Sequence, residues 1–297
     1  MSFDLSTYLA GRRQAVEQAL ERFLPSADSV PQQIHEAMRY SVFAGGKRLR
    51  PILVIAGAET VGGSAESVMP TACALELIHT YSLIHDDLPA MDDDDYRRGR
   101  LTNHKVFGEA VAILAGDALL TLAFRLLAEN FSGARDPRLL PQLLAEIADA
   151  AGTPGMIGGQ AVDVQSEGKS VDAEILEYIH THKTAALIRA SLRAGALLVG
   201  APPSQLTAIS EAGGRLGLAF QIVDDILDVE GSLEELGKMA GSDRRKKKVT
   251  YPEHFGLEAS RLKARRLIQE AKATLAALGP GAEPVSALAD FIFERRS

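Results

Sequence analysis

The chain has 297 residues, of which 46% are hydrophobic, so it is long enough for one large core or two modest ones. Its formal net charge of −7 argues against a general nucleic-acid binder. The single cysteine, Cys73, excludes an intrachain disulfide, and a small buried hydrophobe is its more common role than a catalytic thiol. The beginning of the chain lacks the apolar region of a signal peptide, and the longest clean apolar run, Ile52 to Ala58, is too short to cross a bilayer. We therefore expect a cytoplasmic protein without stable membrane insertion.

Hydrophobic residues recur at spacings of three and four through most of the chain, which predicts helices, and no segment has a convincing strand pattern. In chain order, the sequence predicts helices over Leu5–Phe23, Gln32–Phe43, Pro51–Thr60, Ala65–Ile84, Glu109–Asn130, Leu139–Ala151, Met156–Val164, Ala173–Val199, Ser204–Val229, Leu257–Leu278 and Val285–Phe293. There is no repeat or low-complexity linker. Residues 1–297 are therefore predicted to form a single all-α domain, a bundle of about ten or more helices.

An acidic block follows the fourth predicted helix, in the stretch HTYSLIHDDLPAMDDDDYRRGR from His79 to Arg100. Such a block of like charge repels itself unless something neutralises it. Carboxylate oxygens suit Mg²⁺, which keeps waters and shares itself with substrate phosphates. Because Pro89 breaks the helix, Asp86 and Asp92 can reach one metal cluster despite their spacing. The alternative is a solvated acidic loop beside a basic one.

A second acidic cluster lies in the predicted helix Ser204–Val229, in the stretch FQIVDDILD. Asp224 and Asp228 are four residues apart, so they share one helix face, where like charges are unfavourable unless a metal offsets them. Two acidic clusters on two apolar helices indicate facing helices that hold several Mg²⁺ ions and one diphosphate.

Basic residues stand where they can bind anions. Lys47, Arg48 and Arg50 lie between a double-glycine turn and a predicted helix N-terminus, where a bound anion would explain them. Arg97 and Arg98 carry guanidinium groups that suit diphosphate oxygens. The alternatives are a plain surface patch for the first group and charge balance of the aspartates for the second.

These motifs, with their order and spacing, resemble those of the trans-isoprenyl diphosphate synthase family, most closely its bacterial farnesyl diphosphate synthases. The first acidic motif is DDLPAMD followed by DDDYRRGR, the second is DDILD, and GGKRLRP, GGQAVD, HKT and the ending FIFERRS extend the resemblance over nearly the whole chain. It implies an isoprenoid synthase fold around a central deep cavity, a homodimer, and three Mg²⁺ ions per active site. The implied reaction is a prenyl transfer of isoprenoid biosynthesis. Isopentenyl diphosphate condenses head-to-tail with dimethylallyl and geranyl diphosphates, through an allylic carbocation.

The resemblance also implies a role for individual residues. It makes Asp86, Asp92 and Asp224 the metal ligands. It assigns the isopentenyl diphosphate to Lys47, Arg50, His79 and Arg98, with Arg48 left open. It assigns the allylic diphosphate to Arg97 and Lys183, and a diphosphate to Lys238 and Lys248. It places Thr184 along the carbocation region. Gln221 and the backbone near Lys183 can offer dipoles to the cation, whereas Phe220 is either an aromatic face for the cation or ordinary core.

The length of the product depends on the helix below Asp86. Tyr81 and Ser82 precede Asp86 by five and four residues, about one turn of about 5.4 Å. A bulky Tyr81 would be the floor of a short cavity, as in bacterial farnesyl diphosphate synthases, and this predicts a fifteen-carbon product. The alternatives are a core role for Tyr81 and a geranylgeranyl diphosphate synthase.

Three interpretations without synthase activity are also open. A non-catalytic partner subunit needs broken acidic motifs, a terpene cyclase does not need the isopentenyl diphosphate residues, and a purely structural helical protein needs neither. Both acidic motifs are intact here and the basic set is present, which favours the synthase.

Overall fold

The computed structural model describes residues 3–130, 136–169, 171–230 and 250–294. The all-α prediction is confirmed, since helices make up nearly all the regular structure of these residues. The helices are α1 (Leu5–Phe23), α2 (Gln32–Val42), α3 (Leu49–Thr60), α4 (Ala65–Asp86), α5 (Asn103–Phe107), α6 (Glu109–Glu129), α7 (Leu139–Ala151), α8 (Met156–Ser166), α9 (Ala173–Ile179), η1 (His180–Ala185), α10 (Ala186–Leu198), α11 (Pro203–Glu230), α14 (Tyr251–Phe255), α15 (Leu257–Ala276), η2 (Pro280–Ala282) and α16 (Glu283–Glu294).

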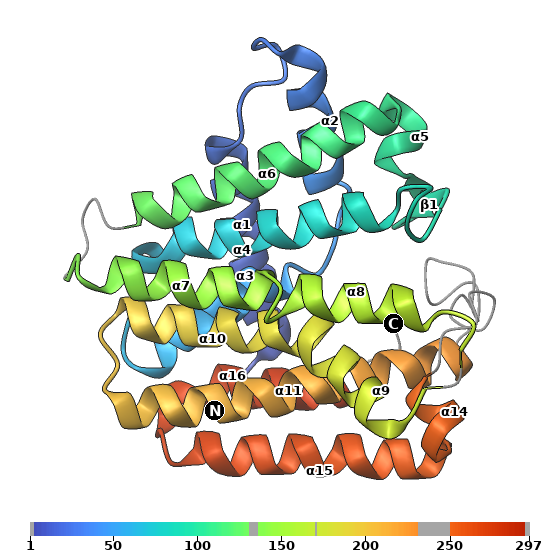
Figure 1. The fold of residues 1–297 in the computed structure, drawn as a ribbon. Helices are drawn as coiled ribbons and strands as arrows, with labels where there is room; N and C mark the ends of the chain where they lie inside the picture. Colours follow the sequence, from blue (N-terminus) through green and yellow to red (C-terminus); the bar gives the residue numbers. More distant parts are fainter. Residues whose placement is uncertain (1–2, 131–135, 170, 231–249, 295–297) are drawn as a thin grey trace.

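The long helices stack side by side through the molecule. Helix α4 packs between α6 and α3, α3 packs on α10, α10 on α11, and α11 on α15 (Figure 1). Their buried hydrophobic side chains form one contiguous cluster that extends from α1 to α16. Apolar faces on both sides explain why α3 and α4 are buried along almost their whole length. The two acidic motifs lie at or near the C-terminal ends of α4 and α11, two helices of this stack.

The predicted helix Ala173–Val199 is wrong as a single α-helix. The structure has α9, then the π-helical turn η1, then α10. A β-carbon on Gly159 would lie 2.2 Å from the backbone nitrogen of Lys183, and one on Gly217 would lie 2.5 Å from the Cα of Ala185. The widened turn therefore sits in backbone contact with α8 and α11. Hydrophobic spacing over a long segment did not reveal this, because π-helix is rare and occurs mostly as single turns inside α-helices.

A short antiparallel hairpin was also missed. Strand β1 (Tyr96–Arg97) pairs with β2 (Arg100–Leu101), and Arg97 is opposite Arg100. The two turn residues, Arg98 and Gly99, both have positive φ, at 53° and 74°. This is the geometry of a two-residue type I′ hairpin turn. Strands of two residues are too short to show an alternating pattern, so the turn residues were the only signal.

One described helix, α6, has the length and apolar character of a membrane span. It has 21 residues and a hydropathy of 1.9, and 39% of its most apolar window is buried inside the structure. A core helix passes the same test, and α6 does pack along α4.

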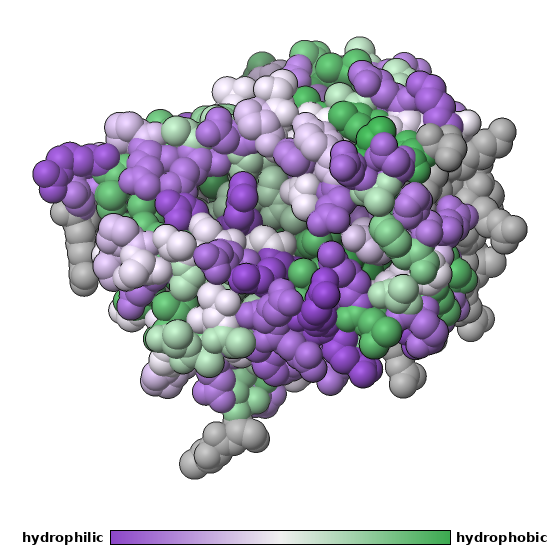
Figure 2. Space-filling view, turned by 60° about the horizontal axis from the view of Figure 1, so that its bottom comes forward, coloured by the Kyte–Doolittle hydropathy of each residue, from purple (hydrophilic) through white to green (hydrophobic). Residues whose placement is uncertain are grey.

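Figure 2 turns the side of the molecule where α15 lies toward the viewer. Hydrophilic side chains gather in the middle of that face, with hydrophobic ones in smaller groups.

Candidate active site

The first acidic motif begins where α4 ends. The helix stops at Asp86, three residues before Pro89, and the backbone N–H of Asp92 donates to the carbonyl of Asp86 at 2.8 Å. The loop therefore folds back on the helix end, as the break at Pro89 predicted. Asp86 and Asp92 lie next to each other in space despite their separation in sequence, and both are partly exposed.

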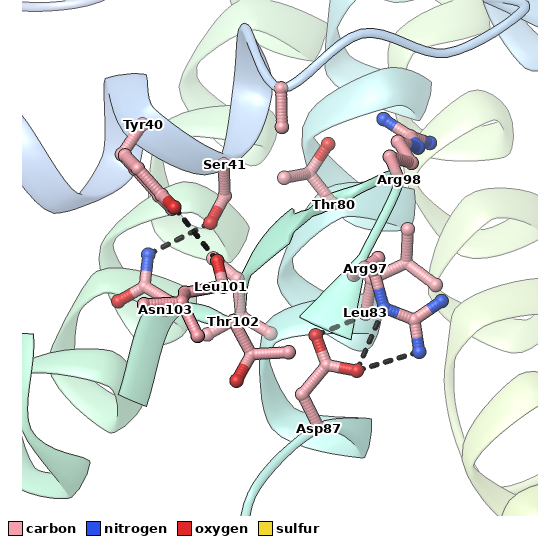
Figure 3. Close-up of a pocket in the computed structure, with 12 residues that line it drawn as sticks. Tyr40, Ser41, Thr80, Leu83, Asp87, Arg97, Arg98, Leu101, Thr102 and Asn103 are labelled. Carbon is pink, nitrogen blue, oxygen red and sulfur yellow. Dashed lines mark hydrogen bonds and ion pairs between the residues drawn. The ribbon is translucent and has the colours of Figure 1, made fainter. Parts of the chain in front are cut away.

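Asp87, between them, has a different role. Its carboxylate is 3% exposed and accepts from Nε of Arg97 at 2.7 and 2.9 Å, while Nη2 of Arg97 lies 2.6 Å from Oδ1. Burial raises the pKa of Asp87, and the Arg97 guanidinium opposes this shift. Figure 3 shows this pair beside a cavity of about 30 Å³, room for about one water. The pair fixes Arg97 against the end of α4. Nε and Nη2 of Arg97 are therefore already engaged by the Asp87 carboxylate.

Arg98 connects the hairpin to the double-glycine turn before α3. Its left-handed backbone directs the guanidinium to the carbonyl of Gly45, to which Nη1 donates. Gly46 has a φ of 123°, which favours glycine, and a β-carbon there would lie 2.7 Å from Cζ of Arg98, so the guanidinium lies directly against this turn. The motifs GGKRLRP and RRGR, about fifty residues apart, therefore meet at one place.

The two arginines of the GGKRLRP motif separate into different roles. Arg48 is 2% exposed, and its guanidinium donates to Glu76 at 2.8 Å and to the carbonyl of Val42 at 2.7 Å. These contacts use two of the Arg48 guanidinium nitrogens within the protein, which argues against a ligand role for this residue. Nε of Arg50, like Nε of Arg48, is buried without a hydrogen-bond partner among the described residues, but Arg50 has no ion pair with a described acidic residue comparable to that of Arg48 with Glu76. The pKa of Arg50 is lowered to about 10, and burial is the main cause. The charge of Glu76 opposes this shift, and the charge of Arg98 adds to it.

His79 lies beside these arginines. Burial lowers its pKa well below the usual value, and the positive charges of Arg50 and Arg98 add to the effect. Its Nδ1 is buried without a hydrogen-bond partner in the described part of the chain. The structure thus brings together three predicted isopentenyl diphosphate ligands, from α3, α4 and the hairpin. Buried basic groups with lowered pKa values and unpartnered polar atoms are typical of a site that binds an anion.

Lys47, the fourth member of that set, lines a different cavity from Arg98. Its Nζ is 5.9 Å from the centre of the Phe291 ring. Lys47 and Phe220 line a cavity of about 230 Å³ between α1, α3, α11 and α16. The sequence had left Phe220 between a cation-facing and a core role, and its side chain is in fact half-buried at the wall of this cavity.

The π turn η1 presents Lys183 and Thr184. Nζ of Lys183 forms an ion pair with Oδ2 of Asp163 at 2.6 Å. Oγ1 of Thr184 donates to Oε1 of Gln221 at 2.7 Å, and Nε2 of Gln221 donates to Oδ1 of Asp225 at 2.9 Å. The predicted residues Lys183, Thr184 and Gln221 are therefore adjacent, on η1 and α11.

The predicted metal ligands fit Mg²⁺ that is shared with a substrate. Across residues 3–130, 136–169, 171–230 and 250–294, no three acidic, histidine or cysteine side chains lie close enough to hold a metal ion alone. Mg²⁺ is usually held by one or two carboxylates, with water and substrate phosphate completing its coordination. Asp86 with Asp92, and Asp224 from α11, are donors of that kind. The predicted diphosphate ligands Lys238 and Lys248 lie outside the described residues.

Tyr81 and Ser82 lie one turn before Asp86, as predicted. Tyr81 is 6% exposed, and its ring meets the His85 ring edge to face at 5.7 Å between centroids. Burial, and then the charge of Asp86, raise the pKa of Tyr81 to about 12. Oγ of Ser82 donates to the carbonyl of His79 at 2.9 Å. His85 in turn contacts α6, where its Nε2 is 3.0 Å from the carbonyl of Ile113.

Sequence reasoning missed two acidic partners. Asp163 was noted only as part of GGQAVD, and Asp225 only as part of DDILD, yet they hold Lys183 and Gln221. The available signal was the cost of burying a lysine in an apolar helix, which requires an anion nearby. Sequence alone could not say which of the aspartates supplies it.

Comparisons with known proteins identify the family of the chain. The profile of the polyprenyl synthetase family matches residues 31–277. A geranylgeranyl diphosphate synthase of Cyanophora paradoxa is 46% identical over 297 residues, which cover 100% of this chain and 98% of that protein. A farnesyl diphosphate synthase of Geobacillus stearothermophilus is 49% identical over 86% of each chain. The crystal structure of a geranyltransferase from Helicobacter pylori, in complex with magnesium and isoprenyl diphosphate, superposes with a TM-score of 0.87 at 32% identity. That superposition covers 99% of both chains.

Proposed function

The chain belongs to the polyprenyl synthetase family and is a prenyltransferase, and from this premise we propose that it is a Mg²⁺-dependent farnesyl diphosphate synthase. It would condense isopentenyl diphosphate with dimethylallyl diphosphate, and then with geranyl diphosphate. We also propose that residues 1–297 act as a single domain, with the roles that the sequence predicts for the acidic and basic residues.

The observation that carries this proposal is the cluster of Arg50, Arg98 and His79. The pKa values of these three groups are lowered, first by burial and then by the positive charges of neighbouring arginines. A bound diphosphate would relieve that repulsion, since guanidinium groups pair well with phosphate oxygens. The cluster lies on α3, α4 and the hairpin, beside the acidic loop that begins at Asp86. An anion site next to a carboxylate pair is the arrangement that two diphosphate substrates and Mg²⁺ require.

The proposed chemistry needs positioning more than proton transfer. Mg²⁺, when bound by Asp86, Asp92 and Asp224, would neutralise the diphosphate leaving group. Arg97 and Lys183 would orient the allylic diphosphate, while the Arg50 cluster would hold the isopentenyl diphosphate with its double bond toward the allylic carbon. Oxygen dipoles of Thr184 and Gln221 would stabilise the allylic cation. We propose three Mg²⁺ ions, as the resemblance implies.

The fifteen-carbon product is favoured by Tyr81. Relatives carry both farnesyl and geranylgeranyl names, so the names alone do not decide between the products. The Tyr81 ring is buried against His85, which rests on α6, so a chain growing down α4 from Asp86 would meet a supported aromatic side chain. This support makes Tyr81 a better stop than a side chain that could swing away.

We further propose a cytoplasmic homodimer. Helix α6 supports the dimer, because Ile113 and Leu114 on it are 44% and 50% exposed. An apolar helix that covers α4 with one face and leaves aliphatic side chains on the other is suited to pack against a second copy.

The experiment that tests the function is a product analysis. The purified protein is incubated with isopentenyl and dimethylallyl diphosphates and Mg²⁺, and the products are separated by chain length. Mainly fifteen carbons support the proposal. Mainly twenty carbons would replace the farnesyl product by geranylgeranyl diphosphate. No condensation by a folded protein with Mg²⁺ present would favour a non-catalytic partner subunit.

A further inference from the structure

The second aspartate of DDILD has a fully occupied carboxylate. Asp225 is 3% exposed, and its Oδ1 accepts from Nε2 of Gln221 at 2.9 Å. Its Oδ2 accepts from the backbone N–H of Tyr251 at 2.9 Å and lies 3.3 Å from Nε2 of His180. These partners come from α11, α14 and η1. Both carboxylate oxygens are thus engaged by the protein itself.

This arrangement decides which way the Gln221 amide faces. An ionised carboxylate only accepts hydrogen bonds, so Gln221 must turn its NH₂ group toward Asp225. Its carbonyl oxygen then points the other way and accepts from Oγ1 of Thr184 at 2.7 Å. The N–H of Tyr251 is a main-chain donor that cannot rotate, and His180 is stacked on the Tyr251 ring at 5.4 Å. Tyr251 and His180 therefore hold one oxygen of the Asp225 carboxylate, and its other oxygen orients the Gln221 amide.

We propose that Asp225 is a positioning residue that selects the orientation of the Gln221 amide, so that an oxygen and not an NH₂ group is presented beside Thr184. The inference rests on the proposed function, in which an allylic cation forms next to these residues. An oxygen dipole stabilises that cation, whereas an NH₂ group in the same place repels it. Asp225 acts through Gln221 and, unlike its neighbour Asp224, is not proposed to bind Mg²⁺.

The variant Asp225→Asn separates these roles because it keeps the size of the side chain. The one oxygen that remains on the substituted side chain is required by the N–H of Tyr251, so the new NH₂ group faces Gln221. The Gln221 amide then rotates by half a turn to offer its oxygen, and its own NH₂ group faces Thr184. Every hydrogen bond keeps a donor and an acceptor, so the fold is preserved while the dipole at the cation site is reversed.

The kinetic parameters of Asp225→Asn report on this reversal. We expect kcat to fall by roughly tenfold or more. We expect the KM of both substrates and the Mg²⁺ concentration for half-maximal rate to stay within about twofold of wild type, since the cost is confined to the transition state.

Two further variants make the test decisive. Asp224→Asn is the matched contrast, and it should raise the Mg²⁺ requirement. Gln221→Leu should lower kcat on its own, and adding Asp225→Asn to it should cost less than about twofold more, because residues that act through one contact are not additive. A raised Mg²⁺ requirement in Asp225→Asn, multiplying effects in the double variant, or an unchanged kcat in either single variant would overturn the proposal. If Asp225→Asn does not fold, an unchanged kcat in Gln221→Leu would still overturn the proposal. A wild-type protein that makes no product would instead refute the proposed function itself.

Discussion

At the scale of single residues, neighbouring side chains of one motif have opposite roles. Arg48 and Arg50 are two positions apart, yet Arg48 forms an ion pair with Glu76, whereas Arg50 has no such pair with a described acidic residue. Asp86 and Asp87 differ in the same way, since Asp87 is paired with Arg97. The motif alone predicts the residue types. The burial of each side chain determines which of them can still bind a ligand.

Tyr81 gives a prediction at this scale. Tyr81→Ala should shift the product from fifteen toward twenty carbons, because it removes the ring that stops the chain on α4. The large-to-small change should cost about 3–5 kcal/mol of stability, so folding is checked by circular dichroism. Product chain length is the measurement.

Tyr81→Phe is the matched control. It keeps the ring but removes a buried hydroxyl that has no hydrogen-bond partner among the described residues. It should keep the fifteen-carbon product at equal or higher stability, since an unpaired buried hydroxyl is costly. An unchanged product in Tyr81→Ala would mean that Tyr81 is ordinary core and not the floor.

At the scale of elements, the position of η1 depends on glycines that let backbones touch. The crossing of α3 and α10 is the clearest case. A β-carbon on Gly57 of α3 would lie 2.0 Å from the carbonyl oxygen of Leu192, and one on Gly195 of α10 would lie 1.8 Å from that of Val54. The two helices therefore meet backbone to backbone. This contact holds α10, and with it η1, close to α3, which carries Arg50 in its first turn.

Gly195→Ala should therefore destabilise the protein by about 3 kcal/mol or more, because neither backbone can yield to the added methyl group. The free energy of unfolding in denaturant measures this. Gly11→Ala in the exposed part of α1 is the control: an added β-carbon there meets nothing within 4 Å, and helix propensity predicts a gain of roughly 0.5–1 kcal/mol. Equal stability of the two variants would contradict a backbone contact between α3 and α10.

At the scale of the whole molecule, the proposed assembly depends on α6. One face of this helix supports α4 and His85, and its other face carries exposed aliphatic side chains. The same helix that supports the predicted floor is thus the proposed dimer contact. Dimerisation would cover this surface and hold α6 against α4.

Leu114→Asp should convert the dimer into a monomer, because an aspartate in an apolar contact loses its hydration without a partner. Size-exclusion chromatography with light scattering measures the mass. Leu262→Asp on α15 is the control, since Leu262 is 64% exposed and lies on a different helix, and it should remain a dimer. A monomeric wild-type protein, or a dimeric Leu114→Asp variant, would contradict the proposed interface.

The sequence by itself determined the helices, the two acidic motifs and the family. Periodicity and motif spacing are local properties, and they placed α1 and α7 at their observed bounds. Only the tertiary structure decided how these parts share their charges. It placed Arg98 on the Gly45 turn, paired Asp163 with Lys183 and Asp225 with the Tyr251 N–H, and formed the π turn η1 between α9 and α10. The physical reason is that the partner of a buried charge is set by distance in space, and residues that are far apart in the chain meet only after the helices pack.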